Sequence, residues 1–208
     1  MTSRAKLLLV GVGGQGVLTA ARVLGDAAYA AGVGAVVGQL HGMSQRGGSV
    51  ECSVLFGSGD SSFLVGDADV LLAFEPLEAA RALPHVGPET VVIVNRGTIV
   101  PFQLTFRGEG YPSVDGIFET LRARGAVVYG VDGPGLVAQI GVGRTLNVVM
   151  LGALAGLGIL PFGPDALLEQ LTAHLPARFV SANRRAFELG MGSTNMHGRD
   201  GERREART

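Results

Sequence analysis

Apolar residues form two kinds of pattern along the chain, separated by short glycine- and proline-rich stretches. Short continuous apolar runs alternate with longer segments in which apolar residues recur every three or four positions. Residues 6–10 form a mainly apolar run, which is typical of a strand buried on both faces. Between residues 15 and 31, apolar side chains recur at three- and four-residue steps, as on the buried face of a helix, and Gly32 ends the pattern. Two further strands are predicted at 33–40 and 49–56.

The second half of the chain continues this order of strand and helix. Turn-rich stretches at 60–67 and 97–113 are expected to hold only short extended pieces, among them a strand at 63–65. The remaining strands are predicted at 70–74, 91–94 and 126–131. The remaining helices are predicted at 76–83, 114–124, 136–140, 145–157, 165–174 and 177–189.

Alternating helices and apolar strands predict a three-layer α/β/α domain with a largely parallel, mixed sheet and a Rossmann-like start. Residues 191–208 are polar and mixed in charge, with few large apolar side chains, and are predicted to form a disordered tail. The predicted organisation is therefore one domain at 1–190 followed by this tail.

Charge and hydropathy restrict what this domain binds. Charged residues make up only 17% of the 208, against about a quarter in an average protein, and the net charge is −1. So few charges at a mean hydropathy of +0.34 indicate a chain rich in glycine and alanine, a surface hidden in a complex, or both. The charge balance gives no indication of nucleic-acid binding.

No segment predicts a membrane span or a secretory signal. The first apolar run breaks at Gly11 and enters a polar loop, where a signal peptide would continue apolar. The apolar stretch 147–160 is shorter than the roughly 20 residues that cross a bilayer. We therefore expect a cytoplasmic protein that does not bind a membrane.

Cysteine and histidine usage argues against metal chemistry on this chain. Cys52 is the only cysteine, whereas an iron–sulfur cluster normally needs about four thiolates. The histidines show no metal-ligand spacing with one another or with Cys52. We expect this chain to hold no cofactor or metal alone.

A first glycine loop lies between the first predicted strand and the first predicted helix. Its glycines fit the pattern G-x-G-x-x-G, which permits a tight turn, close approach of a pyrophosphate and an anion at the helix N-terminus. The acid that would bind a dinucleotide ribose is missing near Gln39, so coenzyme A phosphate, another anion or a packing turn remain as alternatives. The candidate cofactor-binding residues are Gly11, Gly13, Gly14, Gln15 and Gly16.

A second glycine loop, residues 41–48, follows the second predicted strand. Arg46 can clamp a carboxylate or phosphate through its planar guanidinium, and the glycines permit close approach of another backbone. A solvated connecting loop and a structural histidine are the alternatives. The candidate residues for contact with substrate or partner are His41, Ser44, Gln45, Arg46, Gly47 and Gly48, together with Glu75.

Other polar residues follow predicted strands or interrupt helices. Glu75 stands at a helix start, where an acid also complements the helix dipole. Asn95 and Asp132 are most simply turn and cap residues. Asn147 lies in an apolar helix, where a buried amide must find partners, so we expect it to fix a loop or a subunit contact.

The two glycine loops, in this order, resemble the small, gamma-type subunits of 2-oxoacid:ferredoxin oxidoreductases, most closely those of the indolepyruvate type. The likeness extends from about Leu7 to Leu189. It includes Phe74-Glu75-Pro76-Leu77-Glu78-Ala79, and Asn147 together with Leu151-Gly152-Ala153.

This resemblance implies a subunit of a larger enzyme. Members of the family decarboxylate 2-oxoacids oxidatively, pass electrons to ferredoxin and transfer the acyl group to coenzyme A. The resemblance places thiamine diphosphate, Mg and 4Fe-4S clusters on a large (alpha) partner subunit. It also implies that this chain carries no catalytic residue alone and is inactive without its partner. Arylpyruvate is the expected substrate, although pyruvate and branched-chain members share the pattern.

Two other functions remain open at the level of the sequence. A free-standing Rossmann-type oxidoreductase would bind a dinucleotide by itself and would need an acid at the ribose, which the second predicted strand lacks. A non-catalytic scaffold subunit would bind the partner without any effect on turnover.

Arg46→Ala tests the second glycine loop. We expect turnover of the assembled complex to fall by roughly tenfold or more, because a charge-assisted hydrogen bond is lost. The unfolding free energy of the chain should change by less than about 0.5 kcal/mol. Steady-state kinetics and urea denaturation measure the two effects, and parallel losses of activity and stability would remove the functional case for this loop.

Overall fold

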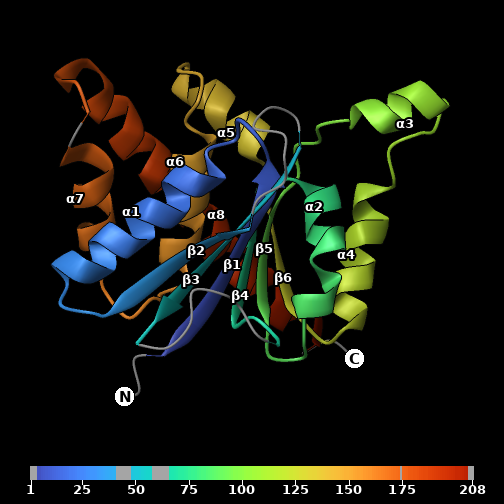
Figure 1. Cartoon of the computed structure of the whole chain (residues 1–208), viewed down its shortest axis with the longest axis horizontal. Helices are drawn as coiled ribbons and strands as arrows, with labels where there is room; N and C mark the ends of the chain where they lie inside the picture. The colour runs from blue at the N-terminus through green and yellow to red at the C-terminus, as the bar shows by residue number, and fades with distance from the viewer. Residues whose placement is uncertain (1–3, 41–47, 58–65, 174, 206–208) are drawn as a thin grey trace.

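A single six-stranded sheet organises the chain (Figure 1). The computed structural model describes residues 4–40, 48–57, 66–173 and 175–205. The strands lie in the order β2-β3-β1-β4-β5-β6. Their bounds are β1 Ala5–Val12, β2 Ala35–Leu40, β3 Ser49–Phe56, β4 Val70–Ala73, β5 Val91–Asn95 and β6 Val127–Val131.

The sheet is parallel from β1 to β6 and antiparallel on the other side of β1. Strands β1, β4, β5 and β6 pair in parallel, whereas β3 pairs antiparallel with both β1 and β2. The first β-α-β unit therefore leaves a gap between its two strands, and β3 fills that gap. The predicted fold class, an α/β domain with a largely parallel, mixed sheet and a Rossmann-like start, is confirmed.

Helices cover both faces of this sheet (Figure 1). Helices α1, α6, α7 and α8 contribute to the core on one face, and α2 and α4 contribute to the core on the other. Among the described residues, no helix is both long enough and apolar enough to cross a membrane. The helix bounds are α1 Val17–Ala30, α2 Pro76–Arg81, η1 Leu83–His85, α3 Phe102–Arg107, α4 Val114–Ala123, α5 Gly133–Ile140, α6 Leu146–Gly156, α7 Pro164–Ala173 and α8 Ala177–Glu205.

The central strand β1 is apolar from Leu7 onward because both of its faces are covered. Leu7 and Leu9 enter the core beneath α1 and α6, while Leu8 and Val10 enter the core beneath α2 and α4. Successive side chains of a strand point to opposite faces, so a strand covered on both sides buries every residue. Each such side chain contributes roughly 1.5–3 kcal/mol of hydrophobic stabilisation.

Two differences from the predicted elements have local causes. Residues 102–107 form helix α3 where only extended pieces were predicted, because Pro101 precedes the helix with a fixed φ of −62° and Gly108 ends it in the left-handed conformation. Helix α5 begins at Gly133, before its predicted start, because the Asp132 carboxylate accepts a hydrogen bond from the Gly135 N–H at 3.0 Å. The strand predicted at 63–65 lies outside the described residues.

The predicted domain boundary at residue 190 falls inside helix α8, which continues to Glu205. The packed domain extends at least to Thr194, which is buried and donates its hydroxyl to the Ala153 carbonyl of α6 at 3.0 Å. Glycines allow α6 and α8 to approach this closely: a Cβ on Gly152 would lie 2.2 Å from the Phe187 carbonyl oxygen. Backbone contact of this kind leaves no pattern of large apolar side chains, so a search of the sequence for such side chains does not detect the packing beyond residue 190.

Two glycines of α8 provide a matched test of this packing. A Cβ at Gly190 would lie 2.1 Å from the Val149 carbonyl oxygen, whereas a Cβ at Gly192 meets nothing within 4 Å. We expect Gly190→Ala to lower the unfolding free energy by about 2–3 kcal/mol, because backbone must move. Gly192→Ala should raise it by about 0.5–1 kcal/mol through helix propensity. Equal stabilities in urea denaturation would show that α6 and α8 do not pack this closely.

Candidate functional site

The two glycine loops meet at the carboxyl edge of the sheet, the edge at which β1, β4, β5 and β6 end. Because β3 runs antiparallel to β1, its first residue, Ser49, pairs with Val12 at the end of β1. The Gly13 N–H donates to the Gly48 carbonyl at 2.8 Å, so the end of the second loop is bonded to the first. The other candidate residues of the second loop, His41, Ser44, Gln45, Arg46 and Gly47, lie outside the described residues.

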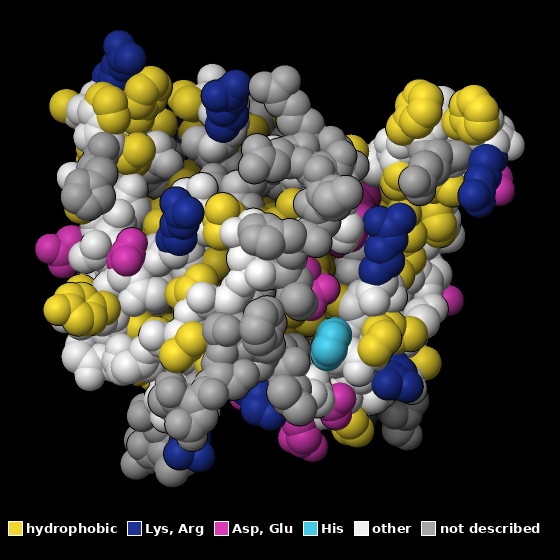
Figure 2. All heavy atoms as spheres, in the orientation of Figure 1, with side chains coloured by type: hydrophobic (Ala, Val, Ile, Leu, Met, Phe, Trp, Pro, Cys, Tyr) yellow, Lys and Arg dark blue, Asp and Glu magenta, His cyan; other side chains and the backbone are white. Residues whose placement is uncertain are grey.

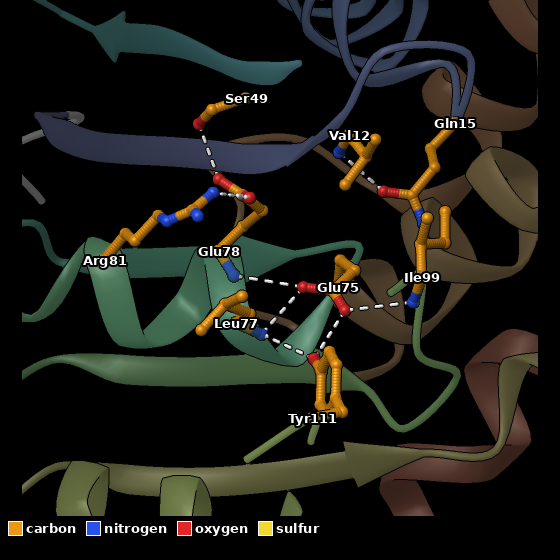
Figure 3. A network of polar contacts seen from close by, with 9 residues as sticks. All are labelled: Val12, Gln15, Ser49, Glu75, Leu77, Glu78, Arg81, Ile99 and Tyr111. Atoms are coloured by element: carbon orange, nitrogen blue, oxygen red, sulfur yellow. Dashed lines mark hydrogen bonds and ion pairs between the residues drawn. The ribbon is translucent and has the colours of Figure 1, made fainter. Parts of the chain in front are cut away.

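Contacts within the first glycine loop explain two of its residues. The Gln15 side chain accepts from the Val12 N–H at 2.7 Å and donates to the Phe74 carbonyl at 2.8 Å (Figure 3 shows the first of these bonds). Gly11 lies beneath this amide, and a Cβ there would come within 2.8 Å of the Gln15 oxygen and 2.9 Å of the Phe74 Cβ. Gly11 and Gln15 therefore build the loop and join it to β4.

The rest of the first loop is more open. Gly14 and Gly16 have φ values of +102° and +83°, which glycine adopts without strain. A Cβ at Gly14 would meet nothing within 4 Å, and Gly16 precedes α1 without a side-chain cap for the helix. Asn147 at the start of α6 lies against Gly16, with its Cβ 3.1 Å from the position of a Cβ there. An uncapped helix N-terminus and a side-chain amide thus lie together at this edge.

The Phe74 carbonyl connects three neighbouring strands. It accepts from Gln15 on the β1 side and from the Asn95 side chain at the end of β5, each at 2.8 Å. Asn95 is buried, and its amide oxygen also accepts from the Gly97 N–H at 3.1 Å. Two side-chain amides therefore occupy both lone pairs of one carbonyl and lock the ends of β1, β4 and β5 together.

Glu75 follows Phe74 and is only 1% exposed (Figure 3). One carboxylate oxygen, Oε2, caps helix α2 by accepting from the N–H groups of Leu77 at 2.7 Å and Glu78 at 3.1 Å. The other, Oε1, accepts from the Tyr111 hydroxyl at 2.5 Å and from the Ile99 N–H at 3.1 Å. Four donors surround the carboxylate, and their hydrogen bonds offset the free-energy cost of removing a charged group from water.

This geometry gives Glu75 a structural role, because its carboxylate accepts hydrogen bonds from four donors of the chain itself. Its interpretation as an acid at a helix start agrees with the cap on α2. Burial, followed by the hydrogen bond to Glu75, raises the pKa of the Tyr111 phenol well above its usual value. Tyr111 therefore keeps its proton and remains a donor to the carboxylate at any physiological pH.

Glu78 is a second buried acid at this edge (Figure 3). Its carboxylate accepts from the Ser49 hydroxyl at 2.5 Å and pairs with Arg81 one turn along α2. Ser49 is the first residue of β3, so Glu78 fixes the point at which the second glycine loop rejoins the sheet. Sequence reasoning did not identify Ser49 or Tyr111, because their partners are distant in the chain and neither residue stands in a recognisable motif.

Comparisons with known proteins agree on one family. The family model described as pyruvate ferredoxin/flavodoxin oxidoreductase matches residues 6–193. The indolepyruvate oxidoreductase subunit IorB of Methanothermobacter thermautotrophicus is 39% identical over 188 residues, covering 90% of this chain and 96% of that protein.

Two solved structures share the fold. The gamma subunit of keto/oxoacid ferredoxin oxidoreductase from Geobacter sulfurreducens has a TM-score of 0.68 at 22% identity, covering 93% of this chain and 99% of its own. The 2-oxoglutarate:ferredoxin oxidoreductase of Magnetococcus marinus has a TM-score of 0.75 at 19% identity. That match covers 94% of this chain but only 32% of the other, so the same fold also forms part of a much longer polypeptide.

Glu75→Gln tests the buried carboxylate. The glutamine amide has only one acceptor oxygen, and its NH2 group would face two of the donors that Glu75 now accepts from. We therefore expect the unfolding free energy to fall by about 2–4 kcal/mol. Tyr111→Phe removes one hydrogen bond and should cost about 1–2 kcal/mol. Glu119→Gln, at an exposed position of α4, is the isosteric control. Chemical denaturation compares the three, and a Glu75→Gln protein as stable as the Glu119→Gln control would contradict the role of this carboxylate.

Proposed function

Because this chain belongs to the pyruvate ferredoxin/flavodoxin oxidoreductase family, we propose that it is the small subunit of an indolepyruvate:ferredoxin oxidoreductase. The observation that carries the choice of substrate is the match to an indolepyruvate oxidoreductase subunit, which spans nearly the whole of both proteins. The structure supports the family through its fold, which it shares with a keto/oxoacid ferredoxin oxidoreductase gamma subunit, and through the hydrogen bond that joins the two glycine loops.

The proposed reaction converts an arylpyruvate and coenzyme A into an arylacetyl-CoA and CO2. The carbon–carbon bond to the carboxylate breaks, a thioester bond forms, and the electron pair released reduces ferredoxin one electron at a time. Thiamine diphosphate with Mg, and iron–sulfur clusters, would supply the decarboxylation and the electron transfer.

This chain's own residues do not fit an iron–sulfur cluster. Cys52 is the only thiol, and it is fully buried in β3 between β1 and β2. Burial, and next the charge of Glu51, raises the pKa of this thiol to about 11, whereas a cluster binds thiolates. The clusters, and with them thiamine diphosphate, are therefore assigned in this proposal to the large subunit.

The contribution of this chain is proposed to lie at the carboxyl edge. Gly14 is open there, and Gly16 lies against Asn147 at the uncapped N-terminus of α1. Gly48, the last residue of the 41–48 loop, accepts a hydrogen bond from the neighbouring Gly13. Backbone N–H groups at a helix N-terminus favour an anion, so this edge suits a phosphate of coenzyme A or the carboxylate of the oxoacid. Gly11, Gly13 and Gln15 support this surface through their contacts within the chain.

Reconstitution of the complex tests this function. The chain and the large subunit encoded in the same genome are purified anaerobically, separately and together, and assayed for ferredoxin reduction with coenzyme A and indolepyruvate, pyruvate or 2-oxoglutarate. We expect activity only from the mixture, with the highest kcat/KM for indolepyruvate. The chain alone should neither reduce ferredoxin nor bind a nicotinamide dinucleotide.

Two results would contradict the proposal. Equal turnover by the large subunit with and without this chain would reduce the chain to a scaffold. Stoichiometric binding of a dinucleotide by the isolated chain, measured by calorimetry, would favour a free-standing oxidoreductase instead.

A further inference from the structure

An exposed apolar surface lies on the segment between β5 and α4. This segment, residues 97–111, is called the α3 arm here, and it stands away from the sheet (Figure 1). Phe102 and Phe106 on the arm are 79% and 81% exposed, and Ile99 and Val100 at its base are also exposed. Figure 2 shows apolar side chains at the end of the lobe that the arm forms at the upper right.

The two phenylalanines form one surface. They are four residues apart on α3, so they lie on the same side of the helix, and their rings stack with centroids 6.2 Å apart. A helix of only six residues is not stable in water by itself, and exposed aromatic rings add nothing to the core of this domain. Contacts with the sheet therefore do not explain why the arm presents phenylalanine at both positions.

One carboxylate holds both ends of the arm. Oε1 of Glu75 accepts from the Ile99 N–H at the beginning of the arm and from the Tyr111 hydroxyl at its end. Glu75 is itself fixed by its bonds to the first turn of α2. The arm is thus tied to the rigid carboxyl edge at its base, and a surface positioned in advance loses less entropy when a partner binds.

We infer that the α3 arm docks onto the large subunit of the oxidoreductase, with Phe102 and Phe106 as the anchors of that interface. This inference rests on the proposed function. Aromatic residues that become fully buried at the centre of an interface commonly dominate its binding energy. The arm departs from the same edge as the two glycine loops, so a partner bound to the arm also reaches the candidate site.

The area of the patch favours a large partner over a short peptide. The four exposed apolar side chains offer on the order of 400 Å², about half of the ~800 Å² that each partner buries in a standard interface. The patch therefore suits the core of a contact whose remainder lies on the neighbouring edge. The longer chain from Magnetococcus marinus, of which a domain of this fold is only 32%, shows that the fold occurs joined to a much larger polypeptide.

The test compares the double variant Phe102→Ser/Phe106→Ser with a matched control, Tyr29→Ser. Tyr29 is 87% exposed near the end of α1, on a helix outside the arm. Purified large subunit is titrated with each full-length chain, and the Kd is measured by biolayer interferometry, with the Tm of each chain recorded. We expect the double variant to bind at least roughly 30-fold more weakly and the control to bind within about twofold of the wild type.

Tyr111→Phe provides a second variant that leaves the phenylalanine surface unchanged. It removes one of the two bonds that hold the arm to Glu75, so we expect roughly three- to tenfold weaker binding. The wild-type chain, which keeps the Tyr111 hydroxyl, is titrated in parallel and its Kd is the reference.

The possible outcomes separate this inference from the proposed function. If the wild-type chain binds the large subunit and supports turnover, but the double variant binds as tightly as Tyr29→Ser, the docking role of the arm is overturned and the proposed function stands. If the wild-type chain does not bind the large subunit, both are overturned. If the double variant abolishes a dimer of this chain in sedimentation without weakening the complex, the occupant is a second copy and the inference is overturned.

Discussion

The buried carboxylate of Glu75 is the constraint around which the carboxyl edge is built. A charge removed from water needs several hydrogen-bond donors, and here the four donors come from three structural parts. Leu77 and Glu78 supply the first turn of α2, Ile99 supplies the base of the α3 arm, and Tyr111 supplies its other end. The hydrogen bonds to this one carboxylate therefore fix the start of α2 and both ends of the α3 arm.

The residue before Glu75 applies the same principle to the sheet. The Phe74 carbonyl would be left without a partner where β4 ends, and the amides of Gln15 and Asn95 fill both of its lone pairs. Among the described candidate residues, the polar side chains of Gln15 and Glu75 are both engaged in hydrogen bonds within the protein. Gly14 is open at the described edge, and Gly16 lies against Asn147 at the uncapped start of α1, which is a small set of groups for a complete active site. A site of this kind suits a chain that completes the surface of a larger enzyme.

The periodicity of the sequence was sufficient to predict most strands and helices, because burial on one or both faces leaves a local pattern. Strand β3 was predicted with its observed bounds at 49–56. The order of the strands could not be read in this way, since nothing local shows that β3 inserts antiparallel between β1 and β2. The Glu75–Tyr111 hydrogen bond joins residues 36 positions apart in the sequence. The α6–α8 contact depends on glycines, which permit it because they have no side chain. Such features arise only when the fold brings distant backbone together.

The low charge content acquires a physical meaning once the fold is known. A charged fraction of 17% is compatible with a glycine-rich core or with a covered surface, and composition alone does not distinguish them. The structure shows glycines in the packed core and apolar side chains exposed at the surface, in different places. Glycines allow close backbone contact between α6 and α8, while stacked phenylalanines stand exposed on α3. Exposed aromatic rings on a positioned arm favour association over solubility, as the proposed docking of this arm requires.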